Sequence, residues 1–396
     1  MNPAAPPTNQ NDPFKIATPA MDFIRSLFHE VAAAKASDLH IESLDGRLGI
    51  RMRVDGALHF LTPPPPHLAR EIIAAIKTMA HLDSSERRVP QDGRMAWQHE
   101  GRSVEFRVST LPTHYGESMV LRLLDSQARR LTLNQLHLPP SIETAIAQAL
   151  EKPHGMFLVT GPTGSGKTTT LYAFLETMRT SPRKILTVED PVEYAIPGAM
   201  QVGVKPEIGL DFARALRSFL RHDPDVLLVG EIRDEPTARI AVQAALTGHF
   251  VLSSLHTQHA AGAIDRLIDL GIEPFIVASV VDSLLAQRLV RTICPACKKA
   301  YKPSQEELKK LALSEDFAGT IYCGAGCQAC YHTGYQGRQA IFEFLKVTEA
   351  LRSKITNSSH DLHAHATQEG MRSLRDEAIR LVLEGATSLE EIAPYL

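Results

Sequence analysis

Residues 161–168 read GPTGSGKT and match G-x-x-x-x-G-K-[ST], the pattern of a phosphate-binding loop. The apolar run 156–159 precedes the loop and predicts a buried strand, and residues 169–175 after it predict a helix. In this strand–loop–helix context the glycines let backbone N–H groups surround a phosphate without clashes of Cβ atoms. An ordinary glycine-rich turn, which is the alternative, needs neither flank.

The residue types in this loop divide the work of holding a nucleotide. The N-terminus of the helix contributes its dipole, Lys167 can reach the terminal phosphates, and the hydroxyl of Thr168 can hold Mg²⁺. The residues expected to bind ATP are Gly161, Pro162, Thr163, Gly164, Ser165, Gly166, Lys167, Thr168 and Thr169.

Outward from the loop, strands alternate with helices, which is the pattern of a parallel α/β sheet. The predicted strands are 156–160, 184–189, 226–230 and 249–254. The predicted helices are 140–151, 167–179, 211–221, 235–247 and 260–270. Right-handed crossovers bring the carboxyl ends of such strands to one edge of the sheet, where ligands bind.

Charged and polar residues close three of these strands, and we interpret them as an active site. A charged residue at the end of a buried strand costs free energy unless it has a partner. Glu231 follows four apolar residues and a glycine, as in a Walker B strand, and is the candidate for polarising the attacking water or holding Mg²⁺ through water. Glu189 is a second candidate for that work, and His256 closes the third strand. The alternative for either carboxylate is a helix cap or a surface ion pair.

The first third of the chain has a different pattern. Residues 1–18 lack periodicity and predict a disordered tail. One amphipathic helix follows from Met21, and then the apolar period changes to two, with turns at Asp45-Gly46 and Asp55-Gly56. This pattern predicts an antiparallel meander, after which a helix is expected at about 67–81.

A second hairpin is predicted within residues 103–124, with its turn near His114 and Tyr115. A register symmetric about that turn places Arg107 opposite Arg122. Like charges opposite each other are unfavourable unless an anion lies between them. The alternative is that both side chains reach solvent or meet carboxylates such as those of Glu105 or Glu117.

Two C-x-x-C motifs predict a metal site. They are CPAC, with Cys294 and Cys297, and CQAC, with Cys327 and Cys330. Four thiolates around Zn²⁺ make a structural site, and the long intervening stretch must fold as its own small module. Cys323 lies near the second motif, but the C-x-x-C geometry favours Cys327. Two unrelated cysteine pairs are the alternative.

Composition narrows the classes of protein. The chain has 396 residues, enough for two or three domains, and 44% hydrophobic and 22% charged residues are ordinary for a globular protein. The net charge of −3 provides no basic field, so we expect no stable nucleic-acid partner. No run approaches the roughly 18 apolar residues of a membrane span, and the N-terminus lacks a signal peptide. We therefore expect a cytosolic protein without a transmembrane segment, in which five cysteines favour metal binding or free thiols.

Together these motifs resemble the secretion and pilus-assembly ATPases of type II secretion and type IV pilus systems. The resemblance covers about residues 20–396 and is far more specific than the phosphate loop alone. Three segments look like the family's N-terminal sensor-like domain: ASDLHIE (36–42), RMRVDG (51–56) and VPQDGR (89–94). VEDPVEY (188–194) looks like its Asp box, and VGEIRD (229–234) looks like its Walker B motif. TGHFVLSSLHT (247–257) looks like its His box, and CQACYHTGYQGR (327–338) looks like its second zinc knuckle.

The resemblance implies an α/β fold in which a RecA-like P-loop NTPase domain with a parallel-rich sheet follows an α+β PAS-like N-terminal domain. A tetracysteine zinc module and a helical C-terminal subdomain complete the chain. The expected boundaries are 1–18 for the disordered tail, 19–125 for the PAS-like domain, 126–135 for a linker, 136–290 for the ATPase domain, 291–340 for the zinc module and 341–396 for the helical subdomain.

The resemblance also implies a function: a homohexameric motor that hydrolyses Mg-ATP at the cytoplasmic face of the bacterial inner membrane. Such motors of the zinc-containing assembly branch act on an inner-membrane platform protein and cytoplasmic assembly components to add pilin-like subunits. ATP, Mg²⁺ and Zn²⁺ are the implied cofactors, and arginines matching Arg107 and Arg122 contact phosphate. Longer members carry an extra N-terminal domain, whereas a short tail stands here, so secretion, piliation and DNA-uptake competence all stay open.

Two other functions compete with this one. A DNA-directed RecA-type motor would use the cysteine module as a nucleic-acid knuckle, but the net charge and the lack of a basic aromatic stripe argue against it. A non-catalytic nucleotide-binding scaffold would not need Glu189, Glu231 and His256.

Overall fold

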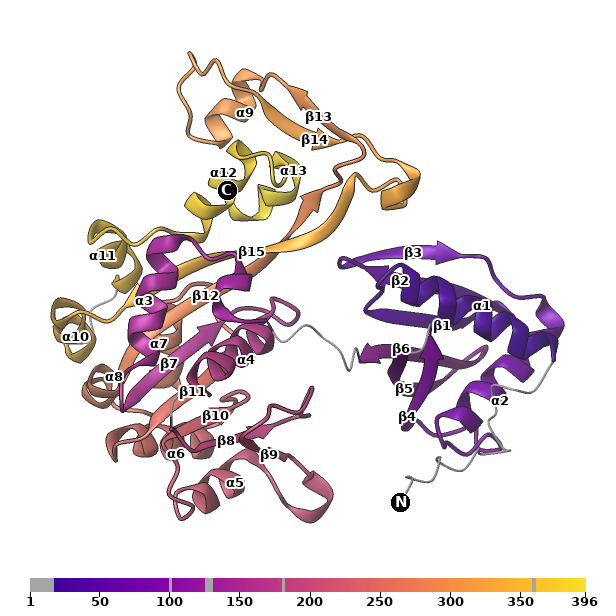
Figure 1. The fold of residues 1–396 in the computed structure, drawn as a ribbon, viewed down its shortest axis with the longest axis horizontal. Coiled ribbons are helices and arrows are strands. Elements are labelled where there is room, and N and C mark those ends of the chain that lie inside the picture. The colour runs from indigo at the N-terminus through magenta and orange to yellow at the C-terminus, as the bar shows by residue number, and fades with distance from the viewer. Residues whose placement is uncertain (1–17, 100–101, 125–130, 180–181, 358–360) are drawn as a thin grey trace, which may run out of the picture. The chain divides into compact units, whose positions relative to one another are not determined.

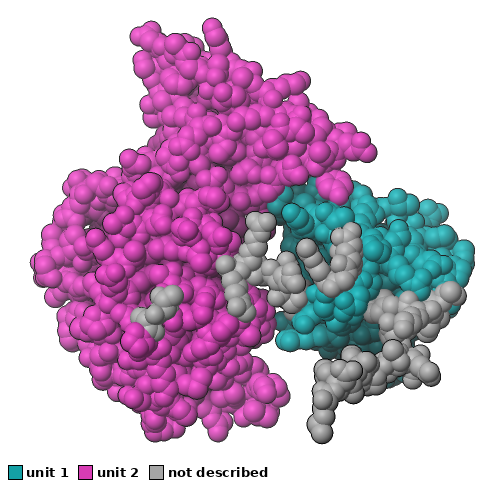
Figure 2. Space-filling model, in the orientation of Figure 1, with its two compact units in different colours: residues 1–128 teal, residues 129–396 magenta. Residues whose placement is uncertain are grey.

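The computed structural model describes residues 18–99, 102–124, 131–179, 182–357 and 361–396. The chain divides into two compact units, residues 1–128 and 129–396, which Figure 2 colours separately. Most of the predicted disordered tail, residues 1–17, and residues 126–130 of the predicted linker lie outside the described residues.

In the described part of unit 1, six strands form one antiparallel sheet in the order β3-β2-β1-β6-β5-β4 (Figure 1). Its elements are α1 (Pro19–Ala33), β1 (Asp38–Leu44), β2 (Arg47–Val54), β3 (Ala57–Leu61), η2 (Pro66–Leu68), α2 (Ala69–Met79), β4 (Gln91–His99), β5 (Arg102–Thr113) and β6 (Gly116–Leu124). The predicted meander and both of its turns are confirmed. Asp45 and Gly46 have φ of 46° and 76°, the positive pair that a tight type I′ hairpin turn requires.

Unit 1 is held together by apolar side chains at the spacings that the sequence predicts. Thr18 caps α1 by accepting the N–H of Met21 at 3.3 Å, and Ile24, Phe28 and other residues of one face of the helix are buried. In β1 the buried residues Leu39 and Ile41 alternate with polar ones, so one face of the sheet packs against the helices.

Unit 2 is built on a sheet of seven described strands in the order β15-β12-β7-β11-β10-β8-β9 (Figure 1). Its first elements are η3 (Leu133–Leu136), α3 (Pro140–Leu150), β7 (Gly155–Thr160), α4 (Lys167–Met178), β8 (Ile185–Glu189), β9 (Ala199–Gly203), η4 (Pro206–Ile208), α5 (Phe212–Phe219), β10 (Val226–Val229), α6 (Glu235–Leu246), β11 (Phe250–Leu255), α7 (Gly262–Asp269) and α8 (Pro274–Val280). Every predicted strand and helix around the phosphate loop is found within two residues of its expected ends. In the order of the sheet, the neighbouring strands β12, β7, β11, β10, β8 and β9 are all parallel, as predicted.

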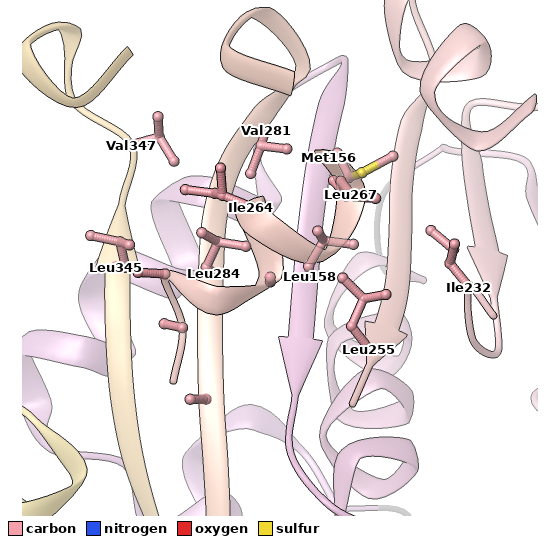
Figure 3. Close-up of a cluster of buried hydrophobic side chains, with 14 of the residues drawn as sticks. Met156, Leu158, Ile232, Leu255, Ile264, Leu267, Val281, Leu284, Leu345 and Val347 are labelled. Atoms are coloured by element: carbon pink, nitrogen blue, oxygen red, sulfur yellow. The ribbon is translucent and has the colours of Figure 1, made fainter. Parts of the chain in front are cut away.

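Helices cover both faces of this sheet, which explains why its strands are continuous apolar runs. Met156 and Leu158 of β7 pack toward α5–α8, whereas Phe157 and Val159 pack toward α3 and α4. Figure 3 shows the first of these cores, with Leu158 beside Leu284 of the neighbouring strand. The core therefore fixes the strand ends that surround the phosphate loop.

A long antiparallel pair is formed by β12 (Val281–Ile293) and β15 (Tyr335–Lys346), two strands that the sequence pattern did not predict. The pair extends beyond the rest of the sheet in Figure 1. The apolar run 275–286 continues from α8 straight into β12, and periodicity alone does not separate a buried strand from a buried helix. The expected helical subdomain at 341–396 is wrong at its start, because residues 341–346 are strand.

The rest of unit 2 lies around this pair. Its elements are β13 (Lys298–Tyr301), α9 (Gln305–Lys310), β14 (Ile321–Gly324), η5 (Gln328–Cys330), α10 (Glu349–Thr356), α11 (Leu362–Gln368), α12 (Leu374–Leu383), α13 (Leu389–Ile392) and η6 (Ala393–Tyr395). Residues 131–135, expected in the linker, include part of η3, whose Leu133 and Leu136 are buried against unit 2. Among the described helices, none has the length and apolar character needed to cross a bilayer.

Candidate functional site

The phosphate loop lies between β7 and α4, as the sequence predicts, and its glycines are needed for conformation and for space. Gly161, Gly164 and Gly166 have φ of 154°, 79° and 87°. A Cβ atom on Gly161 would lie 2.5 Å from the carbonyl oxygen of Gln287, and one on Gly166 would lie 2.7 Å from Gln287 Nε2. A larger residue at either position would therefore force the loop away from β12.

Gln287 of β12 supports the loop from the sheet and was not among the residues predicted for the site. Its buried side chain donates from Nε2 to the carbonyl oxygen of Ser165 at 2.8 Å. Its Oε1 accepts the hydroxyl of Thr170, in the first turns of α4, at 2.6 Å. The one available signal was a glutamine within the apolar sequence LLAQRLV, where a buried amide needs partners.

Replacing Gln287 with alanine should weaken ATP binding and lower the free energy of unfolding. The carbonyl of Ser165 and the hydroxyl of Thr170 would lose their buried partner, at about 1–3 kcal/mol for each group. Nucleotide titration and thermal unfolding measure the two effects, with the exposed Gln243→Ala of α6 as the control. Equal affinity and stability in both variants would show that Gln287 does not support the loop.

Lys167 is positioned over the loop by its own backbone. Its Nζ donates to the carbonyl oxygens of Gly161 at 2.7 Å and of Pro162 at 3.0 Å. Burial lowers the pKa of Lys167, the charge of Glu231 opposes this shift, and that of Arg288 adds to it. The ammonium group is thus within electrostatic reach of both residues. The neighbouring residues Thr168 and Thr169 are exposed to solvent, so their hydroxyl groups are accessible to a ligand.

Glu231 and His256 meet at the ends of the neighbouring strands β10 and β11. His256 Nε2 lies 3.3 Å from Glu231 Oε2, and Arg233 Nη2 donates to Glu231 Oε1 at 2.5 Å. Ser254 of β11 fixes the strand end by donating its hydroxyl to the carbonyl of Gly230 at 2.7 Å. Burial of Glu231 favours its neutral form, but Arg233 and His256 outweigh burial and lower the pKa of this carboxyl. A carboxylate of this kind stays ionised and can polarise an attacking water or hold Mg²⁺ through water.

Glu189 lies in a different environment, at the buried end of β8. Its carboxylate accepts hydrogen bonds from the hydroxyl of Tyr172, from Thr187 Oγ1 at 2.5 Å and from Gln201 Nε2 at 3.1 Å. Burial, together with the charge of Glu189, raises the pKa of Tyr172. These contacts connect β8 to α4 and β9, and among the described residues Glu189 contacts neither Glu231 nor His256.

Arg107 and Arg122 are in unit 1, and their predicted opposition across the β5–β6 hairpin is confirmed. Arg94 of β4, which the site prediction missed, stands opposite Arg107 on its other side. All three are exposed and form a row across the sheet, the arginine row. Arg122 Nε donates to Asp38 Oδ1 at 3.0 Å.

The carboxylates proposed as alternatives do not account for this row. Glu117 pairs with buried Lys77 at 2.7 Å, and Asp38 is the carboxylate that pairs with the row among the described residues. Three neighbouring guanidinium groups with one carboxylate retain an excess of positive charge, which an anion can compensate.

The predicted cysteines come together in one cluster at the end of the β12–β15 pair. The Sγ–Sγ distances are 3.9 Å for Cys294 and Cys327, 3.8 Å for Cys297 and Cys330, and 3.7 Å for Cys327 and Cys330. A tetrahedron of bonds of about 2.3 Å places its sulfur atoms about 3.8 Å apart, so the cluster fits Zn²⁺. Cys323 of β14 is outside the cluster, as predicted.

The backbone also favours a thiolate in this cluster. Burial of Cys330 opposes ionisation, but its Sγ accepts the N–H groups of Cys327 at 3.2 Å and Gly334 at 3.3 Å, and the pKa of Cys330 falls to about 6. Thiolate is the form of cysteine that binds a metal.

Curated relatives resemble nearly the whole chain. The type II secretion system protein E of Pseudomonas aeruginosa is 48% identical over 376 residues, covering 94% of this chain and 75% of the relative. The type II secretion system ATPase E of Vibrio cholerae is 46% identical over 378 residues, with the same coverage. The type IV pilus assembly ATPase PilB of Thermus thermophilus is 43% identical over 377 residues, covering 94% of this chain and 42% of the relative.

Two solved structures share the fold. The Legionella pneumophila ATPase DotB has a TM-score of 0.70 at 21% identity, covering 99% of this chain and 97% of that one. The pilus retraction motor PilT with bound ADP has a TM-score of 0.64 at 24% identity, covering 94% and 96%. The family model described as type II/IV secretion system protein matches residues 15–394. The chain therefore belongs to the type II/IV secretion system protein family and is an ATPase.

Proposed function

We propose that the chain is a motor subunit that hydrolyses Mg-ATP to drive assembly of a type IV pilus or of a type II secretion pseudopilus. The observation that carries this proposal is the pair of Glu231 and His256 beside a complete phosphate loop. Sequence identities of 48% to a type II secretion protein E and of 43% to a pilus assembly ATPase support filament assembly as the process that hydrolysis drives. DNA-uptake competence, which also uses a pilin-like filament, is the alternative pathway.

In this proposal the residues of unit 2 divide the chemistry of hydrolysis. The loop Gly161–Thr168 and Thr169 hold the ATP phosphates, Lys167 neutralises the terminal ones, and the hydroxyl of Thr168 holds Mg²⁺. Glu231, kept ionised by Arg233 and His256, orients and polarises the attacking water. Mg²⁺ supplies charge neutralisation to the phosphates when it is bound.

Glu189 contributes to this site indirectly. Because its carboxylate is held by Tyr172, Thr187 and Gln201, we assign it as a positioning residue. Tyr172 belongs to α4, the helix whose first turn carries Lys167 and Thr168. Glu189 thereby orients the helix end on which the phosphates rest, instead of sharing the work of Glu231.

We also propose that Arg107 and Arg122 contact the phosphates of ATP from the sensor-like unit. Alanine at either position should lower turnover by about tenfold to a hundredfold and nucleotide affinity by less, because a charge-assisted donor aimed at the transferred phosphate acts most strongly in the transition state. Steady-state hydrolysis and nucleotide titration separate the two effects. Arg47→Ala, an exposed arginine of the same sheet, is the control. Unchanged turnover in both variants would refute the assignment.

For the rest of the chain we propose a PAS-like domain at 19–125 and a RecA-like domain at 136–290 that also includes β15. The four cysteines hold one structural Zn²⁺ within the module 291–340, and helices α10–α13 form the C-terminal subdomain. The working form is a homohexamer at the cytoplasmic face of the inner membrane, where it acts on a platform protein and on cytoplasmic assembly components.

One assay distinguishes this motor from a DNA-directed one. The purified chain should hydrolyse ATP with Mg²⁺, and adding a detergent-solubilised inner-membrane platform protein of a pilus or secretion system should stimulate turnover. Single- or double-stranded DNA should not. Stimulation by DNA and not by the platform protein would support the DNA-directed motor and contradict the proposed function.

A further inference from the structure

A cavity of about 880 Å³ in unit 2 contains three residues that the proposed mechanism does not use. Its wall runs from Thr163 of the phosphate loop and His256 to the C-terminal helices, and it includes His259, Glu343 and His363. These three come from distant parts of the chain: the segment after β11, strand β15 and helix α11. Their candidate ligand atoms all lie within 4.8 Å of one another.

We infer that His259, Glu343 and His363 form a second metal site, distinct from the cysteine cluster, for a divalent transition-metal ion of the zinc class. Two imidazoles and one carboxylate are ligands that Zn²⁺, Co²⁺ and Ni²⁺ accept. Mg²⁺ prefers an all-oxygen shell, so the magnesium of ATP does not compete for the site. The cavity leaves room for water or another ligand to complete the coordination.

Glu343 is the fixed member of the site, because its carboxylate is fully buried and already oriented. Oε1 accepts the N–H of Ala260 at 2.8 Å, and Oε2 accepts the N–H of Leu374 at 3.3 Å. Such donors to a ligating carboxylate are the outer contacts that orient metal ligands. Each oxygen still has capacity to bind an ion.

The buried charge of Glu343 also calls for compensation. Among the described residues, no lysine or arginine lies within ion-pair distance of it, and the imidazole of His363 is its one titratable partner. Arg288 lines the same cavity and lies within electrostatic reach of Glu343, but its guanidinium donates to the carbonyl oxygens of Gln287 at 2.8 Å and of Gln258 at 2.7 Å. A divalent ion between Glu343 and the histidines would supply positive charge in direct contact with the carboxylate.

The two histidines are placed to close on such an ion. His363 Nε2 lies 3.3 Å from Glu343 Oε2, which is about the spacing of two ligands that share an ion at about 2.0–2.2 Å. The rings of His259 and His363 have centroids 4.8 Å apart. His259 is exposed and the side chain of His363 is 37% exposed, so both rings can rotate toward Glu343 without repacking the core.

The charges around the cavity set the expected affinity. Arg288 and Arg375 line the same wall and disfavour a second positive charge. We therefore expect weaker binding here than at the cysteine cluster, with the ion exchangeable with solvent. A bound ion would connect helix α11 to the segment 256–259, which carries His256, and would make the order of that segment depend on metal.

The test is a titration of Co²⁺ into the full chain, purified without a histidine tag and with its cysteine cluster filled by Zn²⁺. Binding at the second site should produce visible absorption bands of cobalt without thiolate charge-transfer bands. His363→Gln and His259→Gln should each weaken cobalt affinity by about tenfold to a hundredfold. His365→Gln, on the same helix but outside the cluster, is the matched control.

A second measurement tests the same site without substituting the buried Glu343. Cobalt or zinc added beyond the cysteine site should raise the melting temperature of the wild-type chain and of His365→Gln, but not of the His259/His363 double variant. No cobalt bound beyond the cysteine cluster, or equal binding by the wild type and the double variant, would overturn the inference. Neither result depends on ATP hydrolysis, so the proposed motor function would stand or fall separately.

Discussion

Replacing Lys167 with alanine should abolish ATP hydrolysis, with a loss of about a hundredfold or more in turnover. The ammonium group is held over the loop by the carbonyls of Gly161 and Pro162, where the phosphate-loop pattern predicts the terminal phosphates of a bound nucleotide. Its removal leaves the developing charge on the transferred phosphate without its nearest compensating cation. A hundredfold loss corresponds to about 3 kcal/mol of transition-state stabilisation.

The measurement is phosphate release with Mg²⁺, made beside thermal unfolding to show that the variant is folded. The control is Lys205→Ala, which removes an exposed lysine between β9 and α5. Glu231→Gln is an informative companion, because it should lose turnover but keep nucleotide binding, whereas Lys167→Ala should lose both. Normal turnover in Lys167→Ala would remove the basis of the proposed mechanism.

The parts of this site that follow from local sequence were predictable. The loop, its strand and its helix form a continuous segment, and the positive φ values of Gly161, Gly164 and Gly166 follow from this local loop pattern. The close approach of Gln287 to Gly161 and Gly166 is the part of their environment that the local sequence does not contain. The pairing of Arg107 with Arg122 was also predictable, because a tight turn at His114 and Tyr115 fixes the register of both strands.

The parts that depend on distant pairing were not predictable. Gln287 supports the loop only because β12 lies beside β7, and β12 follows α8 with no glycine or proline to mark the change. The environment of Glu189 depends on α4 and β9, so its place at a strand end was predictable, but its hydrogen bonds with Tyr172 and Gln201 were not. The same holds for Glu343, because its hydrogen-bond partners lie far away in the sequence. His363 is 20 residues away, Leu374 is 31 and Ala260 is 83.

The cysteine cluster gives the second large expected effect: Cys297→Ser should release one zinc equivalent per chain and unfold the surrounding module. The stretch between the two motifs is held by a two-stranded ladder of β13 and β14, a helix of 6 residues and the burial of Leu311 and Ile321 in the core of unit 2. Short ladders of this kind are marginal in water on their own. Apparent binding energies for structural zinc run to about 10–16 kcal/mol, so the metal outweighs these contacts.

The loss should spread along the strands that carry the cysteines. Cys294 follows the last residue of β12, and its N–H donates to the carbonyl of Gly334 at 2.9 Å, just before β15 begins. Hydrogen exchange should therefore rise from the module into the end of the β12–β15 pair at Ile293 and Tyr335, while the apolar strands β7 and β11 stay protected.

Metal analysis and hydrogen exchange of Cys297→Ser test this together, with Cys323→Ser as the matched control. Cys323 is a cysteine of the same module that lies outside the cluster, so its serine variant should keep one zinc and the wild-type exchange pattern. A full zinc equivalent retained in Cys297→Ser, or zinc lost from Cys323→Ser, would show that the ligand set is wrong. Because β12 also carries Gln287, fraying that reaches the middle of this strand would loosen the phosphate loop, and turnover would then fall with the metal content.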